Sequence, residues 1–428
     1  MTSTTRTRSK TPRASATAPE PIPVIGTTTP RRAPRGPRIA PLDNLTLSRK
    51  EGFRAAVDAP PRPQPERLIN GQLQNLTEAA RREYNRRRNV WHANLPTIKT
   101  TPLLELHEQL EDLVGSNQHD GDKAKGAIAV EGPAGIGKSV AVMDFAKAFH
   151  RQTIADLGEF TEAGHERWPV CRVGLNGDTT IKDFNRALLS FYAHAGIRKG
   201  TAPEFADRAL DCVISCSTRL LIVDDVHFLK QRATSIQISN QFKYIANEFP
   251  LTILFVGIDL KSRGLYSDGT PAAGILGQSA RRITPLAFRS FSVYDEAHRR
   301  EWRQLLLRLE QQIVLAGNHR GMLVDLSDHL WARSSGHIGS LTALITRACH
   351  RAIRTGRECI DLTLLQHIPL DVAAAAELPG LRAQLEHAHR STRPRRDHPR
   401  TPGRQPKARP PHSQTDAKQR AIASPATS

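Results

Sequence analysis

One stretch of sequence decides the fold: Gly132-Pro133-Ala134-Gly135-Ile136-Gly137-Lys138-Ser139. It matches the pattern GxxxxGK followed by Ser or Thr, and it lies between an apolar run and a helical stretch that begins SVAVMDFAKAFH. Glycines let the backbone wrap around phosphates so that N–H groups point inward at the start of a helix. Lys138 adds a positive charge for the outer phosphates, and the Ser139 hydroxyl suits Mg²⁺. The stretch, extended by Val140 in the helix, therefore predicts a site for ATP and Mg²⁺.

A second motif places two carboxylates at the end of an apolar run, in RLLIVDD at 219–225. In an ATP site Asp224 would orient Mg²⁺ through its water shell, and Asp225 would position or activate the attacking water. Aspartate at 225 is one methylene shorter than the more usual glutamate, so slow hydrolysis or a switch-like role stays open. His227 follows two positions later, and either contact with the γ-phosphate network or plain packing would explain it, with packing favoured.

The apolar pattern predicts an α/β fold. Short apolar runs alternate with helical stretches, which implies a largely parallel sheet of five strands covered on both faces. The runs are GAIAVEG at 126–132, PVCRVGL at 169–175, RLLIVDD at 219–225, LTILFVG at 251–257 and ITPLAF at 283–288. Beyond about 293 only helical periodicity remains. We therefore expect an α-helical subdomain after the sheet.

Two helices are expected before the first strand. A polar, basic one covers about 72–92. The other begins at Thr101, which can cap it, with Pro102 suited to the first helical position. Its apolar residues repeat on one face and are Leu103, Leu106, Leu110 and Val114. This second helix is expected to pack on a core.

The formal net charge of +19 over 428 residues is concentrated at the two ends of the chain. Residues 1–40 carry +7 and residues 390–428 carry +8, whereas 41–389 carry only +4. The two end segments also hold 14 of the 29 prolines, so we predict disordered basic arms, with linker continuing to about 65. Such arms attract nucleic-acid phosphate in a salt-dependent, sequence-independent way, or serve solubility alone.

The sequence favours a cytoplasmic protein with no membrane partner. Its longest apolar runs are far too short to span a bilayer, and the N-terminus lacks the apolar stretch of a signal peptide. An organelle transit peptide is the weaker interpretation of the Arg-rich start, since that segment has prolines and no amphipathic stripe. Five cysteines form no CxxC pair, so free thiols in a reducing compartment are expected.

The order of these motifs resembles the AAA+ ATPases, and more closely the TniB group of transposon ATPases, related to TnsC. The resemblance covers roughly residues 75–370 and leaves both arms unmatched. Its motifs are YNRRRNVWH with IKTTP at 98–102, GPAGIGKS, LLIVDDVHFL at 220–229, QSARRI at 278–283 and SSGHIGSLTALITRA at 334–348. It implies an AAA+ P-loop NTPase with a central parallel five-stranded sheet and a helical lid.

The composition, the apolar pattern and the resemblance together predict boundaries for the parts of the chain. We expect a disordered basic arm and linker at 1–65, N-terminal helices at 66–120 and an AAA+ α/β ATPase domain at 121–290. A helical lid at 291–389 and a disordered basic arm at 390–428 complete the division.

Further site residues follow from the resemblance alone. It implies that Arg281 or Arg282, before the last strand, reaches a neighbouring subunit's nucleotide as a finger, although a solvated helix end would look the same. Asp259 is the candidate sensor residue after the fourth strand. On the lid helix Ser340 and Thr342 stand where many relatives carry a sensor arginine, and Arg347 follows a turn later.

The resemblance implies an ATPase that forms a homo-oligomer in the ATP state on double-stranded DNA and recruits or activates a DDE transposase. The chain would be nucleoid-associated when bound to DNA. Interior candidates for DNA contact are Lys182, Lys230 and Arg232. The segment 81–92 would either follow a DNA backbone or dock on the ATPase body, and docking is favoured because Tyr84 and Trp91 need burial.

Two rival functions share the ATP site. A STAND-type signalling ATPase would use nucleotide state as a switch. However, only about 60 residues of short helix and arm follow the matched part of the lid, which ends near 370, and no repeat array or effector domain is evident. A replication-type clamp or helicase loader would share both the ATP site and the DNA dependence. Only the partner's identity separates that loader from the transposition ATPase.

Overall fold

The computed structural model describes residues 42, 44–120, 123–175, 179–226, 244–245, 247–262, 265 and 282–392. Residues 1–41 and 393–428, which make up most of the two predicted arms, lie outside this description. The chain divides into two compact units, 1–45 and 46–428, and every element below belongs to the second.

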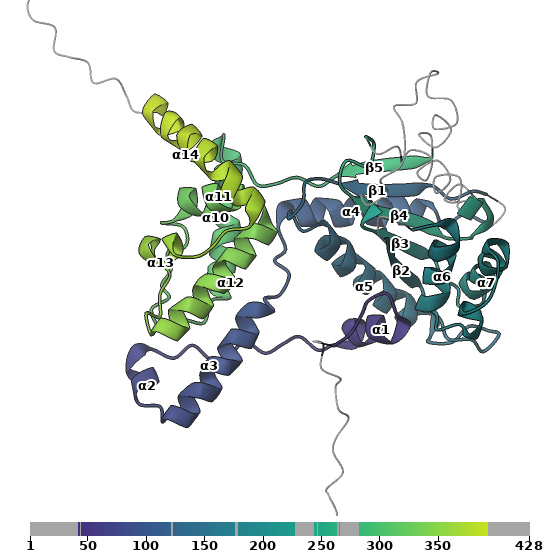
Figure 1. The fold of residues 1–428 in the computed structure, drawn as a ribbon, viewed down its shortest axis with the longest axis horizontal. Helices are drawn as coiled ribbons and strands as arrows, with labels where there is room; N and C mark the ends of the chain where they lie inside the picture. Colours follow the sequence, from purple (N-terminus) through teal and green to yellow (C-terminus); the bar gives the residue numbers. More distant parts are fainter. Residues whose placement is uncertain are drawn as a thin grey trace, which may run out of the picture. The chain divides into compact units, whose positions relative to one another are not determined.

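The five predicted strands are all present and form one parallel sheet in the order β2-β3-β4-β1-β5 (Figure 1). Their bounds are β1 Ala127–Glu131, β2 Val170–Gly174, β3 Leu220–Asp224, β4 Thr252–Gly257 and β5 Ile283–Ala287. Strands β3 and β4 are buried along their whole length, as expected for strands covered on both faces. Parallel strands place their carboxyl ends at one edge of the sheet, so the loop after β1 and the carboxylates after β3 meet there.

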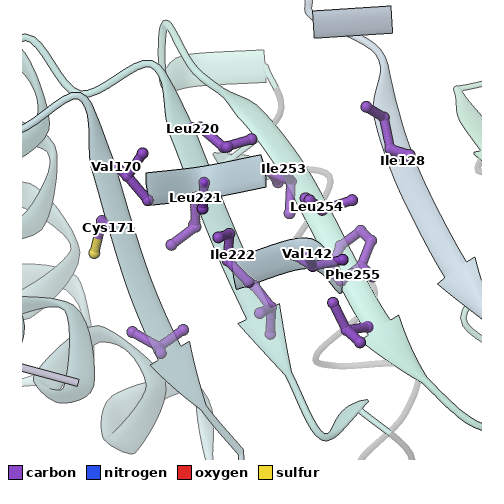
Figure 2. Packing of buried hydrophobic residues seen from close by; sticks show 14 of the residues in the cluster. Ile128, Val142, Val170, Cys171, Leu220, Leu221, Ile222, Ile253, Leu254 and Phe255 are labelled. Carbon is purple, nitrogen blue, oxygen red and sulfur yellow. The ribbon is translucent and has the colours of Figure 1, made fainter. Parts of the chain in front are cut away.

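Helices connect the strands and cover the sheet. They are α5 Lys138–Leu157, α6 Ile181–Phe191, the 3₁₀ turn η1 Ala195–Ile197 and α7 Ala202–Ser215. Side chains from β1, β2, β3 and β4 pack with Val142 of α5 in a continuous apolar core (Figure 2). We call this cluster, which extends from Phe53 to Phe288, the sheet core.

The amphipathic helix expected from Thr101 is α4 Thr101–Ser116, and its predicted apolar face is buried. It starts one residue earlier than predicted, because Thr100 is the cap residue and Thr101 already has helical geometry. The helix ends at Ser116, so Gly115 lies within its last turn. The error is of the size expected for helix ends, which fray.

Two expectations for the N-terminal region were wrong. Residues 50–58, expected as linker, form α1 Lys50–Asp58, because Phe53 and Val57 lie one turn apart and are buried in the sheet core. The single helix expected over 72–92 is two, α2 Asn70–Gln74 and α3 Glu78–Ala93. Thr77 separates them, since its hydroxyl accepts a hydrogen bond from the amide of Ala80 and caps α3.

The region after the sheet is helical, as predicted. Its helices are α10 Glu296–Gln311, α11 Ser327–Ser334, α12 Ile338–Thr355, α13 Leu362–Gln366 and α14 Val372–Thr392. Their apolar faces form a second cluster, from Phe291 to Leu385, which we call the helical core. Within the described ranges, none of the helices combines the length and apolar character needed to cross a membrane.

The basic segment at 81–92 does dock, but on the helical subdomain rather than on the ATPase body. The indole of Trp91 is buried and donates a hydrogen bond to the carbonyl of Gln312 at 2.7 Å. The backbone carbonyl of His92 accepts one from the Thr346 hydroxyl of α12. The buried ring of Trp91 and the buried Arg88, which forms an ion pair with Glu358, hold α3 in this position.

Candidate active site

The phosphate-loop residues 132–137 form the turn between β1 and α5. Gly135 and Gly137 have φ of 76° and 89°, a left-handed conformation that side chains rarely adopt. A Cβ on Gly132 would lie 2.4 Å from the carbonyl oxygen of Phe288, so this position has room only for glycine. The first glycine thus allows the close approach of the β5 end, and the other two shape the turn into α5.

Lys138 is buried at the first position of α5, and its ammonium folds back on the loop. Its Nζ donates hydrogen bonds to the carbonyls of Gly132 at 2.7 Å and Pro133 at 2.6 Å. Burial lowers the pKa of Lys138, while the carboxylates of Asp224 and Asp225 oppose that shift. The ammonium is therefore a positive charge held beside the loop, where phosphates would approach it.

Ser139 and the two aspartates come together at the carboxyl edge of the sheet, as the sequence predicted. The Ser139 hydroxyl donates a hydrogen bond to Oδ1 of Asp224 at 3.1 Å. The same oxygen accepts the backbone amide of Asp225 at 3.0 Å, and Asp225 has a left-handed φ of 61°. Asp224 is buried and Asp225 is half-buried. Hydroxyl and carboxylate oxygens are the ligands that Mg²⁺ prefers, so this donor set fits the metal that the sequence implies.

One functional side chain was missed by the sequence analysis. Arg172 of β2 forms an ion pair with Asp224, with 2.7 Å between Nη2 and Oδ2. Its Nη1 donates a second hydrogen bond to the Ser48 hydroxyl at 3.2 Å. A lone arginine inside the apolar run PVCRVGL was the available signal, because a charge within a buried strand normally has a partner.

A cavity of about 490 Å³ opens beside the phosphate loop. Ile136, Gly137 and Val140 line one side, and the segment between α3 and α4 lines another with Leu95 and Ile98. Its remaining apolar lining includes Phe291 and Ile338. A mainly apolar cavity with a few polar groups at its edge suits an aromatic ring such as a nucleobase. No separate signal in the sequence pointed to this cavity, since its walls come from five segments that lie far apart along the chain.

The start of α12 touches the phosphate loop directly. The amide of Gly339 donates a hydrogen bond to the carbonyl of Gly135 at 2.8 Å, and a Cβ on Gly339 would lie 2.4 Å from that same oxygen. Burial lowers the pKa of the nearby His337, with Lys138 acting in the same direction and Glu377 and Asp371 opposing it. Gly339, the second glycine of the Gly336-His337-Ile338-Gly339 turn, is thus needed for the close contact between the start of α12 and the phosphate loop.

The predicted lid residues have different surroundings. The Thr342 hydroxyl donates to the carbonyls of Ile338 and Gly339 within its own helix, and Thr342 lines the cavity beside the loop. Ser340 hydrogen-bonds the side chain of Asp371, and that bond helps to lower the Asp371 pKa after the larger effect of the Ala374 amide. Arg347 lines the cavity, and its Nη1 donates to the carbonyl of Pro369 at 2.9 Å.

Several other predicted residues do not join this cluster. Arg282 is exposed and donates a hydrogen bond to the side-chain oxygen of Asn247. Lys182 is exposed on α6 with its Nζ 5.6 Å from the centre of the Phe205 ring. Asp259 is exposed, and its charge helps to oppose the lowering of the Lys138 pKa. The remaining predicted residues lie outside the described parts of the chain and are Arg281, His227, Lys230 and Arg232.

A scan against protein families matches residues 88–272 to the family described as bacterial TniB protein. The resemblance to TniB stated from the motifs is therefore confirmed over that range. The predicted fold class is confirmed as well, since the chain has a P-loop, a parallel five-stranded sheet and a helical subdomain after it. A comparison with curated proteins gave no match.

The chain is also similar to several solved structures. The Aeropyrum pernix ORC1 protein, solved in complex with DNA, is 15% identical, with 72% of this chain and 73% of that chain covered and a TM-score of 0.48. The ORC2 protein of the same organism, solved as ADPNP-ADP complexes, is 14% identical, with coverages of 65% and 70% and a TM-score of 0.46. AMPPCP-bound DnaA from Aquifex aeolicus is 16% identical, with coverages of 62% and 68% and a TM-score of 0.35.

Proposed function

We propose that this TniB-like AAA+ ATPase, matched to its family over residues 88–272, hydrolyses ATP and regulates transposition on double-stranded DNA. In this proposal ATP-bound copies assemble as a homo-oligomer on DNA and recruit or activate a DDE transposase. The observation that carries the ATP part is the meeting of Lys138, Ser139 and Asp224 at the carboxyl edge of the sheet. The DNA and transposase parts depend on the family match.

The nucleotide would lie along the loop 132–139 and the start of α5 at Val140. Backbone amides of the loop and the Lys138 ammonium would bind the phosphates, and the adjoining cavity would hold the base. Ser139 and Asp224 would hold Mg²⁺, which neutralises phosphate charge when bound. Asp225, half-buried beside Asp224, is the group that would orient or deprotonate the attacking water. Arg281 or Arg282 of a neighbouring copy would complete the site.

Helix α12 offers a surface suited to a DNA backbone. Its 18 residues include no Asp or Glu, and Arg347, Arg351 and Arg354 share one face at positions i, i+4 and i+7. At 1.5 Å per residue the first and last lie about 10 Å apart along the axis, which spans neighbouring phosphates. No large apolar side chain of α12 is exposed, so the face lacks the anchors typical of a protein interface.

The ATP part is tested by Lys138→Ala. The wild type should bind ATP with Mg²⁺ and hydrolyse it slowly, and duplex DNA at low salt should raise the rate. Lys138→Ala should abolish binding, turnover and DNA-dependent assembly, because the phosphates lose their buried cation. Lys147→Ala, in the same helix but outside the site, is the matched control. ATP binding retained by Lys138→Ala would contradict the proposal.

The DNA part is tested by replacing Arg347, Arg351 and Arg354 together with Gln and measuring duplex affinity against salt. Three lost phosphate contacts should reduce the slope of log affinity against log salt by about 3. A control replacing Arg300 and Arg303 of α10 should leave the slope unchanged. An unchanged slope in the triple variant would exclude this face. One ADP retained through purification, with no response to DNA, would instead favour the signalling ATPase.

Electron microscopy with duplex DNA and a non-hydrolysable ATP analogue tests assembly. Rings or helices around DNA are expected, and monomers under all conditions would defeat the proposal. We keep the division at 66–120, 121–290 and 291–389 as part of the proposal, with basic arms at 1–65 and 390–428 apart from the helix α1. A cytoplasmic location, with association to the nucleoid through DNA, completes it.

A further inference from the structure

The ion pair between Arg172 and Asp224 joins two strands at the candidate metal site. Arg172 lies on β2, the edge strand of the sheet, and Asp224 is the last residue of β3. The backbone register pairs Asp224 with Gly174, so the guanidinium reaches two residues along its own strand to meet the carboxylate. The side chains are 17% and 5% exposed, which leaves little water to screen their charges.

The hydrogen bonds of Asp224 leave space for a metal-bound water. A carboxylate has about four lone-pair sites, two on each oxygen. Oδ1 already accepts the Ser139 hydroxyl and the Asp225 amide. Among the described residues, Oδ2 accepts a hydrogen bond from Arg172 alone, which leaves one of its two lone-pair sites open. Arg172 and a water of Mg²⁺ can therefore share Oδ2.

The charge of Arg172 matters most before a metal arrives. Without the guanidinium, the buried Asp224 carboxylate would be a negative charge beside the path of an incoming triphosphate. Like charges repel strongly where water is excluded. Lys138 also acts on Asp224 through its charge, but its Nζ is hydrogen-bonded to the carbonyls of Gly132 and Pro133, whereas Arg172 contacts the carboxylate directly.

We propose that Arg172 is a positioning residue that holds and neutralises Asp224, so that the site binds a nucleoside polyphosphate even before Mg²⁺ joins it. The inference rests on the proposed ATP site. The hydroxyl of Ser48, just before α1, accepts a hydrogen bond from Nη1 of Arg172 and helps to keep the guanidinium in place. Arg172 balances the charge of Asp224 in the metal-free site, and Mg²⁺ adds two positive charges when it binds.

The test is the affinity for a fluorescent ADP analogue, measured in EDTA and again in saturating Mg²⁺. The wild type should bind in both buffers. Arg172→Gln should weaken binding about tenfold or more in EDTA but only about threefold in Mg²⁺, because the metal replaces the missing positive charge. The ratio of the two affinities is the readout, and a merely structural role for Arg172 would not change that ratio.

Four control variants separate charge from structure. Arg172→Lys keeps a charge at a single contact and should bind in EDTA almost as the wild type does. Asp224→Asn added to Arg172→Gln removes both charges and should restore binding in EDTA. Ser48→Ala should change the ratio about twofold at most, since only a supporting hydrogen bond is lost. Arg186→Gln, an exposed arginine of α6, should change nothing.

The outcomes are distinguishable. If Arg172→Gln weakens nucleotide binding equally in both buffers, the ratio of affinities stays that of the wild type. This result would overturn the inference and leave the ATP site intact. A wild type that binds nucleotide in neither buffer would overturn the proposed function and this inference together. If Arg172→Gln does not fold, by circular dichroism, Arg172→Met, which removes the charge but keeps an apolar chain in the strand, is measured for the same ratio, and a wild-type ratio for that variant overturns the inference.

Discussion

Two buried arginine–carboxylate pairs occupy different regions of the molecule and are built differently. Arg88 of α3 binds Glu358, next to the helical core, through two parallel contacts of 2.6 Å and 2.9 Å. Arg172 binds Asp224, at the edge of the sheet, through one contact of 2.7 Å. The first pair is 1% and 5% exposed and the second 17% and 5%.

The neighbours of the two pairs differ as much as their geometry. The two terminal nitrogens of Arg88 also donate to fixed partners, the carbonyl of Val314 and the Asn85 side chain, and Glu358 also accepts the amide of Ala316. Within the described residues, the buried Nε of Arg88 has no hydrogen-bond partner. Asp224 is shared instead with Ser139, itself a candidate metal ligand. The comparison teaches that a two-contact pair with fixed neighbours holds the structure, whereas a one-contact pair that shares its carboxylate with a candidate metal ligand is suited to function.

The largest effect expected from this comparison is on stability. Arg88→Ala should lower the free energy of unfolding by about 3 to 5 kcal/mol, because it leaves Glu358 as a buried charge without its partner. Chemical denaturation would measure the change. The ratio of nucleotide affinities in EDTA and Mg²⁺ should stay that of the wild type.

A double variant is the matched control for this prediction. Arg88→Met combined with Glu358→Leu removes both charges and should recover most of the lost stability, since apolar side chains of similar size can replace a buried pair. If Arg88→Ala changed the affinity ratio while stability stayed high, the distinction between a structural and a functional pair would fail.

The sequence predicted the parts of the fold that depend on residues close together in the chain, within one strand or one loop. Each strand is a continuous apolar run, and the phosphate loop is a contiguous motif whose glycines, Lys138 and Ser139 need no knowledge of distant contacts. The carboxylate Asp224 was predicted for the same reason, because it ends an apolar run. All of these residues lie where the pattern placed them.

The sequence did not reveal what depends on register between segments. Arg172 contacts Asp224 because strands β2 and β3 lie side by side. The apolar sequence of neither strand indicates which strands are neighbours in the sheet. Arg88 stands in the run Arg86-Arg87-Arg88, and composition does not distinguish the three. Helical spacing does, since Arg88 lies four residues after Tyr84 and three before the buried Trp91 and so shares their face.

The linker expected at 50–58 shows the same limit of composition. Pro and Arg around that segment suggested an unfolded chain, whereas the i, i+4 spacing of Phe53 and Val57 marked a short amphipathic helix. Burial in the sheet core outweighs the unfavourable flanks, because a buried aromatic ring contributes roughly 2 to 3 kcal/mol. Spacing of apolar residues was therefore more informative here than local composition.

A smaller predicted effect is on the pH dependence of the unfolding free energy, through a histidine beside the Arg88 pair. His92, next to Arg88, has its pKa lowered to about 4 by burial and secondarily by the Arg88 charge. Its neutral Nε2 accepts the amide of Val314 at 2.9 Å. Below pH 6.5 the unfolded chain protonates this histidine before the folded chain does, so stability falls as the pH drops toward 4. The expected slope is about 1.4 kcal/mol per pH unit for this group.

His92→Gln keeps an acceptor for the Val314 amide but cannot be protonated, so its unfolding free energy should fall less steeply between pH 6.5 and 4. Denaturation at pH 7, 6, 5 and 4 would measure both slopes. His150 in the sheet region has its pKa lowered to about 4 by burial and by Arg54 and Arg151, so some acid sensitivity should persist in the variant. Identical slopes for wild type and His92→Gln would mean that His92 is already protonated when buried. The pair at Arg88 would then tolerate a second positive charge beside it, and its two contacts and fixed neighbours could not be what distinguishes it from the pair at Arg172.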